Sequence, residues 1–81
     1  MPADKLRSLI TDIILAGRQV EFADDDDLFT GKILDSLDMV QLVSLLEDTF
    51  AFKIQVRELI PENFNSITKL ADYVNRKLAG A

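Results

Sequence analysis

The chain has 81 residues, with neither cysteine nor histidine, and its fourteen acidic and nine basic side chains give a formal net charge of −5. Disulfides and thiolate metal sites are therefore excluded, and the commonest general base and transition-metal ligand is missing. The negative charge disfavours nucleic acids and anionic membrane surfaces as partners, so we expect proteins with basic patches instead.

The first predicted helix covers about residues 3–16. Pro2 suits a helix start and Gly17 a helix end. Apolar side chains recur between them with the period of an amphipathic helix. They are Leu6, Leu9, Ile10, Ile13 and Ile14.

A long connection is predicted for residues 17–34. Connections of this length are unusual inside a small domain and are often functional. Its apolar residues should pack across the helices. They are Val20, Phe22, Leu28, Phe29, Ile33 and Leu34.

A second helix is predicted over residues 36–51, with Asp35 and Asp38 at the N-cap and N3 positions of an acidic capping box. Its apolar stripe comprises Leu37, Val40, Leu42, Val43, Leu45, Leu46 and Phe50. Residues 52–60 alternate loosely, but a lone strand would have no partner, so we predict a loop and then a helical turn over 61–64.

Ser66 should cap a last helix over residues 67–78, with residues 79–81 frayed. The inward side chains of this helix are Ile67, Leu70, Ala71, Val74 and Leu78. The expected fold is all-α: a four-helix up-and-down bundle of three longer helices and one short one, with a long loop between the first two.

Ser36 stands apart from the other serines, which lie inside helices or at the Ser66 cap. If Asp35 caps the second helix, the Ser36 hydroxyl is released and points to solvent. The N–H groups at a helix start favour a bound anion by roughly 0.3–1 kcal/mol. Repulsion from Asp35 and Asp38 would offset part of this. For an arbitrary serine at this position, a simple capping role is the ordinary interpretation.

The run Asp-Ser-Leu-Asp-Met-Val at residues 35–40 resembles the D-S-L signature of acyl carrier proteins, in which the serine carries 4′-phosphopantetheine. The likeness extends roughly from Leu28 to Leu78. It continues at Leu42, Val43, Leu46, Glu47, Phe50, Ile54, Ile60-Pro61 and Ser66-Ile67.

The resemblance implies that a separate phosphopantetheinyl transferase, using coenzyme A and Mg²⁺, joins the arm to Ser36. It also implies that Asp35 helps to hold the metal in that reaction and that Leu37 completes the signature. The thiol of the arm is then the working nucleophile, and the chain itself is not an enzyme. This division of labour suits a protein that has neither cysteine nor histidine.

In the family that the chain resembles, the acidic face of the second helix meets arginine and lysine patches on acyl-loading and acyl-transferring enzymes. That implies partner contacts by Asp38, Gln41, Glu47 and Asp48, with Gln41 standing where many fatty-acid carriers have glutamate. A pocket for an acyl chain would be lined by apolar residues that are equally compatible with an ordinary core. They are Val43, Leu46, Ile54, Leu59, Ile60, Ala71 and Tyr73.

We therefore expect a monomeric, cytoplasmic carrier, with one domain over residues 1–81, that carries acyl thioesters in fatty-acid, lipid or polyketide biosynthesis. No apolar run approaches the roughly 18 residues of a membrane span, and no secretion signal is recognisable. One alternative is an aminoacyl or peptidyl carrier, against which Leu37 argues mildly, because such carriers often have another residue after the serine. The other alternative is an unmodified interaction module with the same fold.

The four consecutive aspartates at residues 24–27 do not match a calcium-binding loop in any register, so no dedicated metal site is expected. Together with Glu21, Asp35 and Asp38 they crowd seven carboxylates around Lys32. We expect their repulsion to destabilise the fold at neutral pH. Added salt, divalent cations or mild acidification should then stabilise it, provided that few of these carboxylates have favourable partners.

Overall fold

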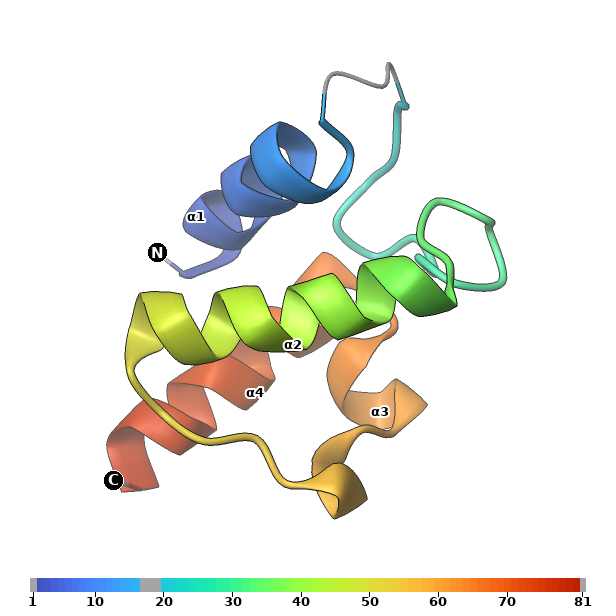
Figure 1. Cartoon of the computed structure of the whole chain (residues 1–81). Coiled ribbons are helices and arrows are strands. Elements are labelled where there is room, and N and C mark those ends of the chain that lie inside the picture. Colours follow the sequence, from blue (N-terminus) through green and yellow to red (C-terminus); the bar gives the residue numbers. More distant parts are fainter. Residues whose placement is uncertain (1, 17–19, 81) are drawn as a thin grey trace.

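The structure is a computed structural model that describes residues 2–16 and 20–80 (Figure 1). Its elements are α1 (Pro2–Leu9), a π-helical turn η1 (Ile10–Ile14), α2 (Ser36–Phe50), a 3₁₀ turn η2 (Val56–Glu58), α3 (Pro61–Phe64) and α4 (Ile67–Gly80). These two segments contain no strand. The expected all-α fold with three longer helices and one short one is confirmed.

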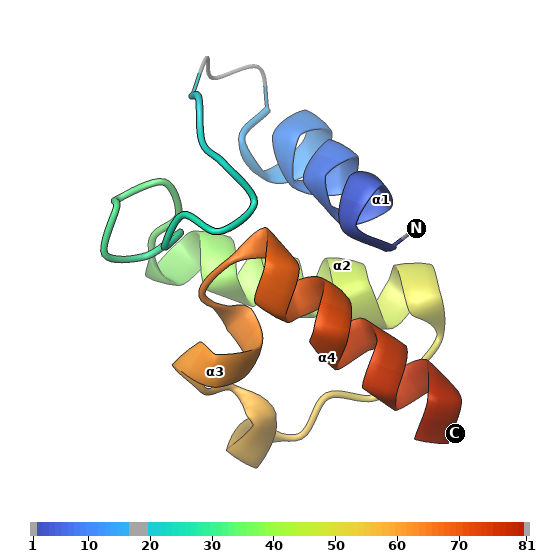
Figure 2. The same ribbon diagram turned by 180° about the vertical axis from the view of Figure 1, so that it is seen from behind.

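The helices pack around one interior. Helix α4 packs against α1 and α3, and η1 contacts α2. In both views α1 runs against the direction of α2 and α4 (Figures 1 and 2). Helix α1 begins and α4 ends at one end of the bundle, whereas α2 starts at the other end, close to α3 and the long loop. The start of α2 is therefore far from the ends of the described chain.

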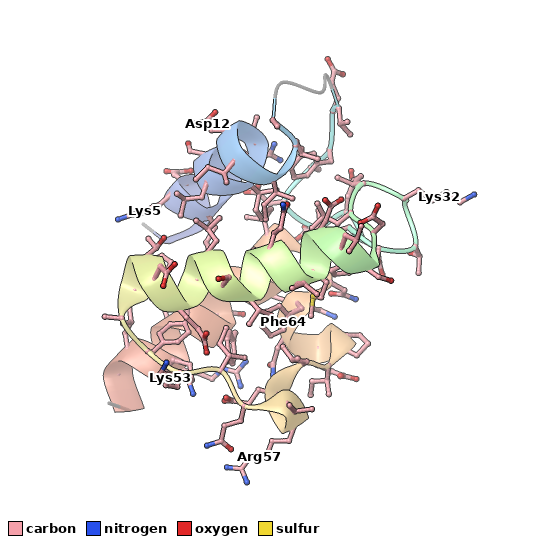
Figure 3. All side chains as sticks on the ribbon, viewed as in Figure 1. Lys5, Asp12, Lys32, Lys53, Arg57 and Phe64 are labelled. Carbon is pink, nitrogen blue, oxygen red and sulfur yellow. The ribbon has the colours of Figure 1, made fainter. Side chains whose placement is uncertain are left out.

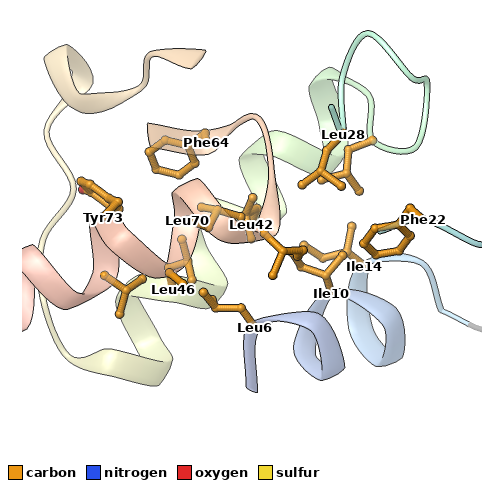
Figure 4. Close-up of a cluster of buried hydrophobic side chains, with 14 of the residues drawn as sticks. Leu6, Ile10, Ile14, Phe22, Leu28, Leu42, Leu46, Phe64, Leu70 and Tyr73 are labelled. Carbon is orange, nitrogen blue, oxygen red and sulfur yellow. The ribbon is translucent and has the colours of Figure 1, made fainter. Parts of the chain in front are cut away.

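The core draws side chains from all four α-helices and from the loop before α2 (Figure 4). Fully buried leucines at positions 42, 46 and 70 lie at its centre. Burying a leucine completely contributes about 1.5–3 kcal/mol. The other buried apolar residues are Leu6, Ile10, Ile14, Leu15, Phe22, Leu28, Leu34, Phe64, Ile67, Ala71, Tyr73 and Val74.

The first helix differs from the expected regular α-helix. The Leu15 N–H donates to the Ile10 carbonyl at 2.8 Å, which makes the last turn a π turn. This wider turn directs both Ile14 and Leu15 into the core, while Ile13, which was expected to face inward, is 53% exposed. The prediction that Ile13 faces the core was wrong, because it assumed 3.6 residues in every turn of the helix. The expected end at Gly17 lies outside the described residues.

The described part of the long loop packs across the bundle as expected. Phe22, Leu28 and Leu34 are buried, and Phe22 and Leu28 belong to the same hydrophobic cluster as Ile10 and Ile14 (Figure 4). The loop is also bound to the other half of the chain, because the Leu28 N–H donates to the Asn65 carbonyl at 2.7 Å. Tertiary contacts, and not the sequence of the loop alone, therefore determine its path.

The aspartates at residues 24–27 have partners that the sequence did not reveal. Asp24 forms an ion pair with Arg7 at 3.0 Å, and Asp25 accepts a hydrogen bond from the Thr68 hydroxyl at 2.8 Å. The other two accept hydrogen bonds from backbone N–H groups. Lys32, by contrast, points away from the bundle (Figure 3). Acidification was expected to stabilise the fold on condition that few of these carboxylates have favourable partners. That condition is not met, because all four aspartates accept hydrogen bonds or form ion pairs that protonation would weaken.

Helix α2 ends at Phe50, and the C-cap residue Ala51 has a φ of 57°, a left-handed conformation that glycine usually supplies. The connection to α3 is held by α2 and α4. The Ile54 N–H donates to the Glu47 carboxylate at 2.8 Å, and Lys77 forms an ion pair with Glu58 at 3.0 Å. This connection is irregular as predicted, apart from the 3₁₀ turn η2, which was not predicted.

The last helix begins where it was predicted, because the Ser66 hydroxyl oxygen accepts the Lys69 N–H at 3.1 Å. It continues to Gly80, past the expected end at residue 78, and Leu78 is exposed although it was expected to face inward. The expected fraying of Ala81 lies outside the described residues. None of the helices built from the described residues is long and apolar enough to cross a membrane.

Candidate functional site

The start of α2 is held by the predicted capping box. The Asp35 carboxylate accepts the Asp38 N–H at 2.9 Å, and the Asp38 carboxylate accepts the Asp35 N–H at 3.1 Å. Asp35 has extended backbone angles, as an N-cap residue requires. Because Asp35 performs the capping role, the next residue, Ser36, is the first residue of the helix and is not needed as a cap.

Ser36 is exposed at this helix start. Two apolar side chains on the same helix also reach solvent: Leu37 is 76% exposed and Val40 is 67% exposed. Both belong to the predicted apolar stripe of α2, but that stripe is wider than the face that the core covers. The hydroxyl therefore stands on a surface with exposed apolar neighbours, which is accessible to a modifying enzyme.

The four residues expected to contact partner enzymes fall into two groups. Gln41 and Asp48 are exposed. Asp38 is only 9% exposed and its carboxylate belongs to the capping box, while Glu47 is partly buried and accepts the Ile54 N–H. Two of the three carboxylates of this face therefore have structural partners inside the protein.

A pocket of about 350 Å³ opens beside Ser36, between the loop, the start of α2 and α3. Most of its lining is apolar, with Asp27, Thr30, Ser36 and Asn65 as the polar members. The apolar members are Phe29, Met39, Leu59, Ile60, Pro61 and Phe64. Sites for small molecules usually have volumes of about 300–1,000 Å³, so this pocket is at the small end of the range.

Only two of the residues expected to line an acyl pocket, Leu59 and Ile60, lie in the pocket beside Ser36. Leu46, Ala71 and Tyr73 are buried in the core instead. Burial raises the pKa of Tyr73 to about 12, and the nearby Glu58 carboxylate adds to this effect. For these three residues the ordinary core interpretation holds, because all three are buried in the hydrophobic cluster and the rings of Phe52 and Phe64 pack against that of Tyr73.

Asp27 and Asn65 are members of the site that sequence reasoning did not identify. The Asp27 carboxylate accepts the N–H groups of Phe29 and Thr30 at 3.0 and 2.9 Å and the Asn65 side-chain amide at 3.3 Å. The Thr30 N–H makes the largest contribution to holding the pKa of Asp27 below its ordinary value of 3.8. An aspartate three residues before a threonine N–H is a recognisable turn signal, whereas nothing local marked Asn65.

The described residues contain no group of three or more acidic side chains arranged to hold a metal ion. The Asp35 carboxylate is adjacent in sequence to the Ser36 hydroxyl and is exposed, so it can still be reached by a metal ion that a partner enzyme holds. The N–H groups of the first turn of α2 also favour an anion on Ser36. The residues present at this helix start therefore fit a phosphodiester on the serine.

Comparison with known proteins agrees with this geometry. The family model of the phosphopantetheine attachment site matches residues 4–74. The D-alanyl carrier proteins of Streptococcus pyogenes serotype M5 (strain Manfredo), serotype M49 (strain NZ131) and serotype M1 are each 40% identical to this chain over 50 residues. These matches span 62% of this chain and 63% of each relative. The chain therefore belongs to the family of phosphopantetheine-binding carrier proteins, whose attachment site takes 4′-phosphopantetheine covalently.

Proposed function

We propose that Ser36 is the residue to which 4′-phosphopantetheine is attached. We also propose that the protein carries a small acyl group as a thioester, with an aminoacyl group as the first candidate. The position of Ser36 supports this most strongly. Its hydroxyl is exposed at the first turn of α2 while Asp35 caps the helix, so modification of Ser36 removes no contact that holds the helix start.

Attachment forms a bond between the Ser36 hydroxyl oxygen and the phosphorus of coenzyme A that bears the pantetheine. The pyrophosphate bond breaks, adenosine 3′,5′-bisphosphate leaves, and the hydroxyl proton passes to a base on the transferase. The Asp35 carboxylate belongs to the residue next to Ser36 in the chain, and it would help to hold the Mg²⁺ of that enzyme. The arm supplies the thiol that forms thioesters, so the chain contributes position and surface but no catalysis of its own.

The size of the space near Ser36 favours a small cargo. Leu46 and Tyr73 are buried in the core, so a long acyl chain would have to displace well-packed side chains. The relatives named as D-alanyl carrier proteins support an aminoacyl cargo such as D-alanine. A lipid or polyketide intermediate is the second candidate, and the apolar lining of the pocket beside Ser36 favours it.

The exposed side of α2 supports a proposal for how partner enzymes would bind. Leu37 and Val40 offer exposed apolar contacts, and Gln41 and Asp48 offer exposed polar ones. Asp38 and Glu47 contribute mainly to the shape of this surface, because their carboxylates accept hydrogen bonds from the chain itself. The transferase and the acyl-loading enzymes should therefore combine an apolar patch with a smaller basic one.

Two mass measurements test this proposal. The purified chain is first incubated with coenzyme A, Mg²⁺ and a transferase of broad specificity, and intact mass then shows whether one pantetheine arm is added. Fragmentation should locate the arm on Ser36. An unmodified chain would support a carrier-like interaction module instead. In the second measurement, hydroxylamine cleaves the thioester of protein isolated from the native cell, which leaves the thiol on the arm and releases the acyl group as its hydroxamic acid. We expect the mass of the hydroxamate of a small amino or carboxylic acid, and the hydroxamate of a long fatty acid would overturn the proposed cargo.

A further inference from the structure

A groove of about 360 Å³ opens between the chain that follows α2 and the last turns of α4. It lies at the end of the bundle opposite to Ser36, because α4 ends there and α2 starts at the other end (Figures 1 and 2). Its lining shares no residue with the pocket beside Ser36. The lining residues are Phe52, Lys53, Gln55, Arg76, Lys77 and Gly80.

The charge of this groove is opposite to that of the protein as a whole. Residues 1–50 contain eleven acidic and four basic side chains, whereas residues 51–81 contain three acidic and five basic ones. Three of these five line the groove, and its described lining includes no carboxylate. Lys77 is paired with Glu58 at 3.0 Å, but Lys53 and Arg76 form no ion pair within the described part of the chain. The groove is therefore a cationic site on an acidic protein.

Arg76 is held in position by neutral acceptors. Its Nη2 donates to the Oδ1 of the buried Asn63 at 2.9 Å, and its Nε donates to the Asp72 carbonyl at 3.4 Å. A guanidinium has five N–H donors in a rigid fork, so three remain for a ligand. Such a fork binds a carboxylate through two parallel hydrogen bonds. Because the side chain is already ordered, less rotamer entropy is lost when a carboxylate binds.

The shape of the groove favours an inserted side chain over a flat surface. Phe52 adds an aromatic ring to the cationic lining, and Val56, which follows Gln55 in the chain, is 84% exposed. A glutamate side chain has the matching parts, because its methylene groups suit the ring and its carboxylate suits the fork. An anionic bilayer is flat, and it would repel the acidic remainder of the protein.

We propose that this groove is a second docking surface, which binds an acidic segment of a partner protein through a carboxylate placed between Arg76 and Lys53. Enzymes that act on Ser36 approach the other end of the bundle, so the two kinds of partner bind at the same time. The groove then holds the protein beside an acidic partner while the start of α2 stays accessible. This inference goes beyond the proposed attachment and does not depend on it.

The test is an NMR titration of the ¹⁵N-labelled, unmodified full chain with a peptide of six glutamates and two leucines that has blocked ends. In 0.1 M salt, where distant charges are screened, the amide signals of residues 52–57 and 76–80 should shift saturably, and those of residues 35–40 should not. Lys53→Gln combined with Arg76→Gln should raise the Kd by about two- to thirty-fold, the range for two exposed ion pairs. Lys32→Gln combined with Lys69→Gln is the matched control, because both lysines are exposed and outside the groove, and it should leave the Kd unchanged.

Absence of saturable shifts in the groove would overturn the proposal. Equal weakening by the two double variants would also overturn it, because net charge alone would then explain binding. If the variant at Arg76 does not fold, Lys53→Gln alone decides, since Lys53 is exposed and should raise the Kd by up to about fivefold.

Two comparison titrations identify the class of partner. Inorganic phosphate and vesicles that contain phosphatidylserine replace the peptide at equal concentration of negative charge. If either shifts the groove signals as strongly as the peptide does, the groove binds small anions or membranes, and the proposed protein partner is wrong. Addition of the arm to Ser36 is then timed with the peptide at saturation. An unchanged rate supports simultaneous binding, and a blocked reaction would overturn it.

Discussion

Asp35 has two separable roles, the capping of α2 and the proposed contact with Mg²⁺ during attachment of the arm. Asp35→Ala removes the acceptor of the Asp38 N–H, a 2.9 Å hydrogen bond, but leaves the reciprocal bond from the residue 35 N–H to Asp38 in place. Loss of an N-cap of this kind typically costs about 1 kcal/mol. For a domain of this size that lowers the melting temperature by about 4–8 °C.

Asp35→Asn separates the two roles, because asparagine keeps an oxygen acceptor for the Asp38 N–H and loses the charge. Its melting temperature, measured by circular dichroism, should stay close to that of the unmutated protein, since asparagine and aspartate cap helices about equally well. Its modification, followed by intact mass over time, should nevertheless slow as much as that of Asp35→Ala, because a neutral amide is a weaker ligand for Mg²⁺.

Two results would refute this reasoning. If Asp35→Ala melts at the same temperature as the unmutated protein, the carboxylate contributes nothing to the helix start and the cap belongs to Asp38 alone. If Asp35→Asn receives the arm as fast as the unmutated protein, the charge of Asp35 takes no part in attachment. In that case any slowing in Asp35→Ala reflects a distorted helix start.

Three further predictions concern neighbouring parts of the structure. Ser36→Ala should fold with an unchanged melting temperature, because the hydroxyl is exposed and not the cap, and intact mass should show no arm; an arm found on another serine would contradict the assignment. The pKa values of Asp27 and Glu58 are both lowered, mainly by backbone N–H donors, so their stabilisation is complete above the ordinary values of 3.8 and 4.5 and is lost as the pH falls below them. Denaturant titrations should therefore give a falling free energy of unfolding between about pH 5 and pH 3, and a rise over that range would restore the repulsion hypothesis. Glu47→Gln should lower the free energy of unfolding by about 1 kcal/mol, because the Ile54 N–H then donates to a neutral amide oxygen, a weaker acceptor than the carboxylate. The matched change Asp48→Asn, at an exposed carboxylate of the same helix, should leave stability unchanged and weaken only partner binding, measured by calorimetry against a loading enzyme.

Local sequence signals determined the features that depend on neighbours in the chain. The box between Asp35 and Asp38 was predictable because both of its hydrogen bonds join residues three apart. The exposure of Ser36 followed from that box without further information. The start of α4 was equally predictable, since the Ser66 cap reaches only to the N–H of Lys69. Such short-range contacts determine where helices start, and the capping box of Asp35 and Asp38 thereby determines the position of Ser36.

Only the tertiary structure determined which distant groups meet. Asp24 contacts Arg7, which is 17 residues away in the sequence, and Asp27 accepts a hydrogen bond from the side-chain amide of Asn65, which is 38 residues away. These contacts turned an acidic run that suggested repulsion into a set of favourable pairs. The π turn before Leu15 has a similar origin, because the packing of two consecutive side chains into the core selects it and helix periodicity does not. Sequence patterns report local preference, whereas pairing and burial depend on which surfaces the folded chain brings together and removes from water.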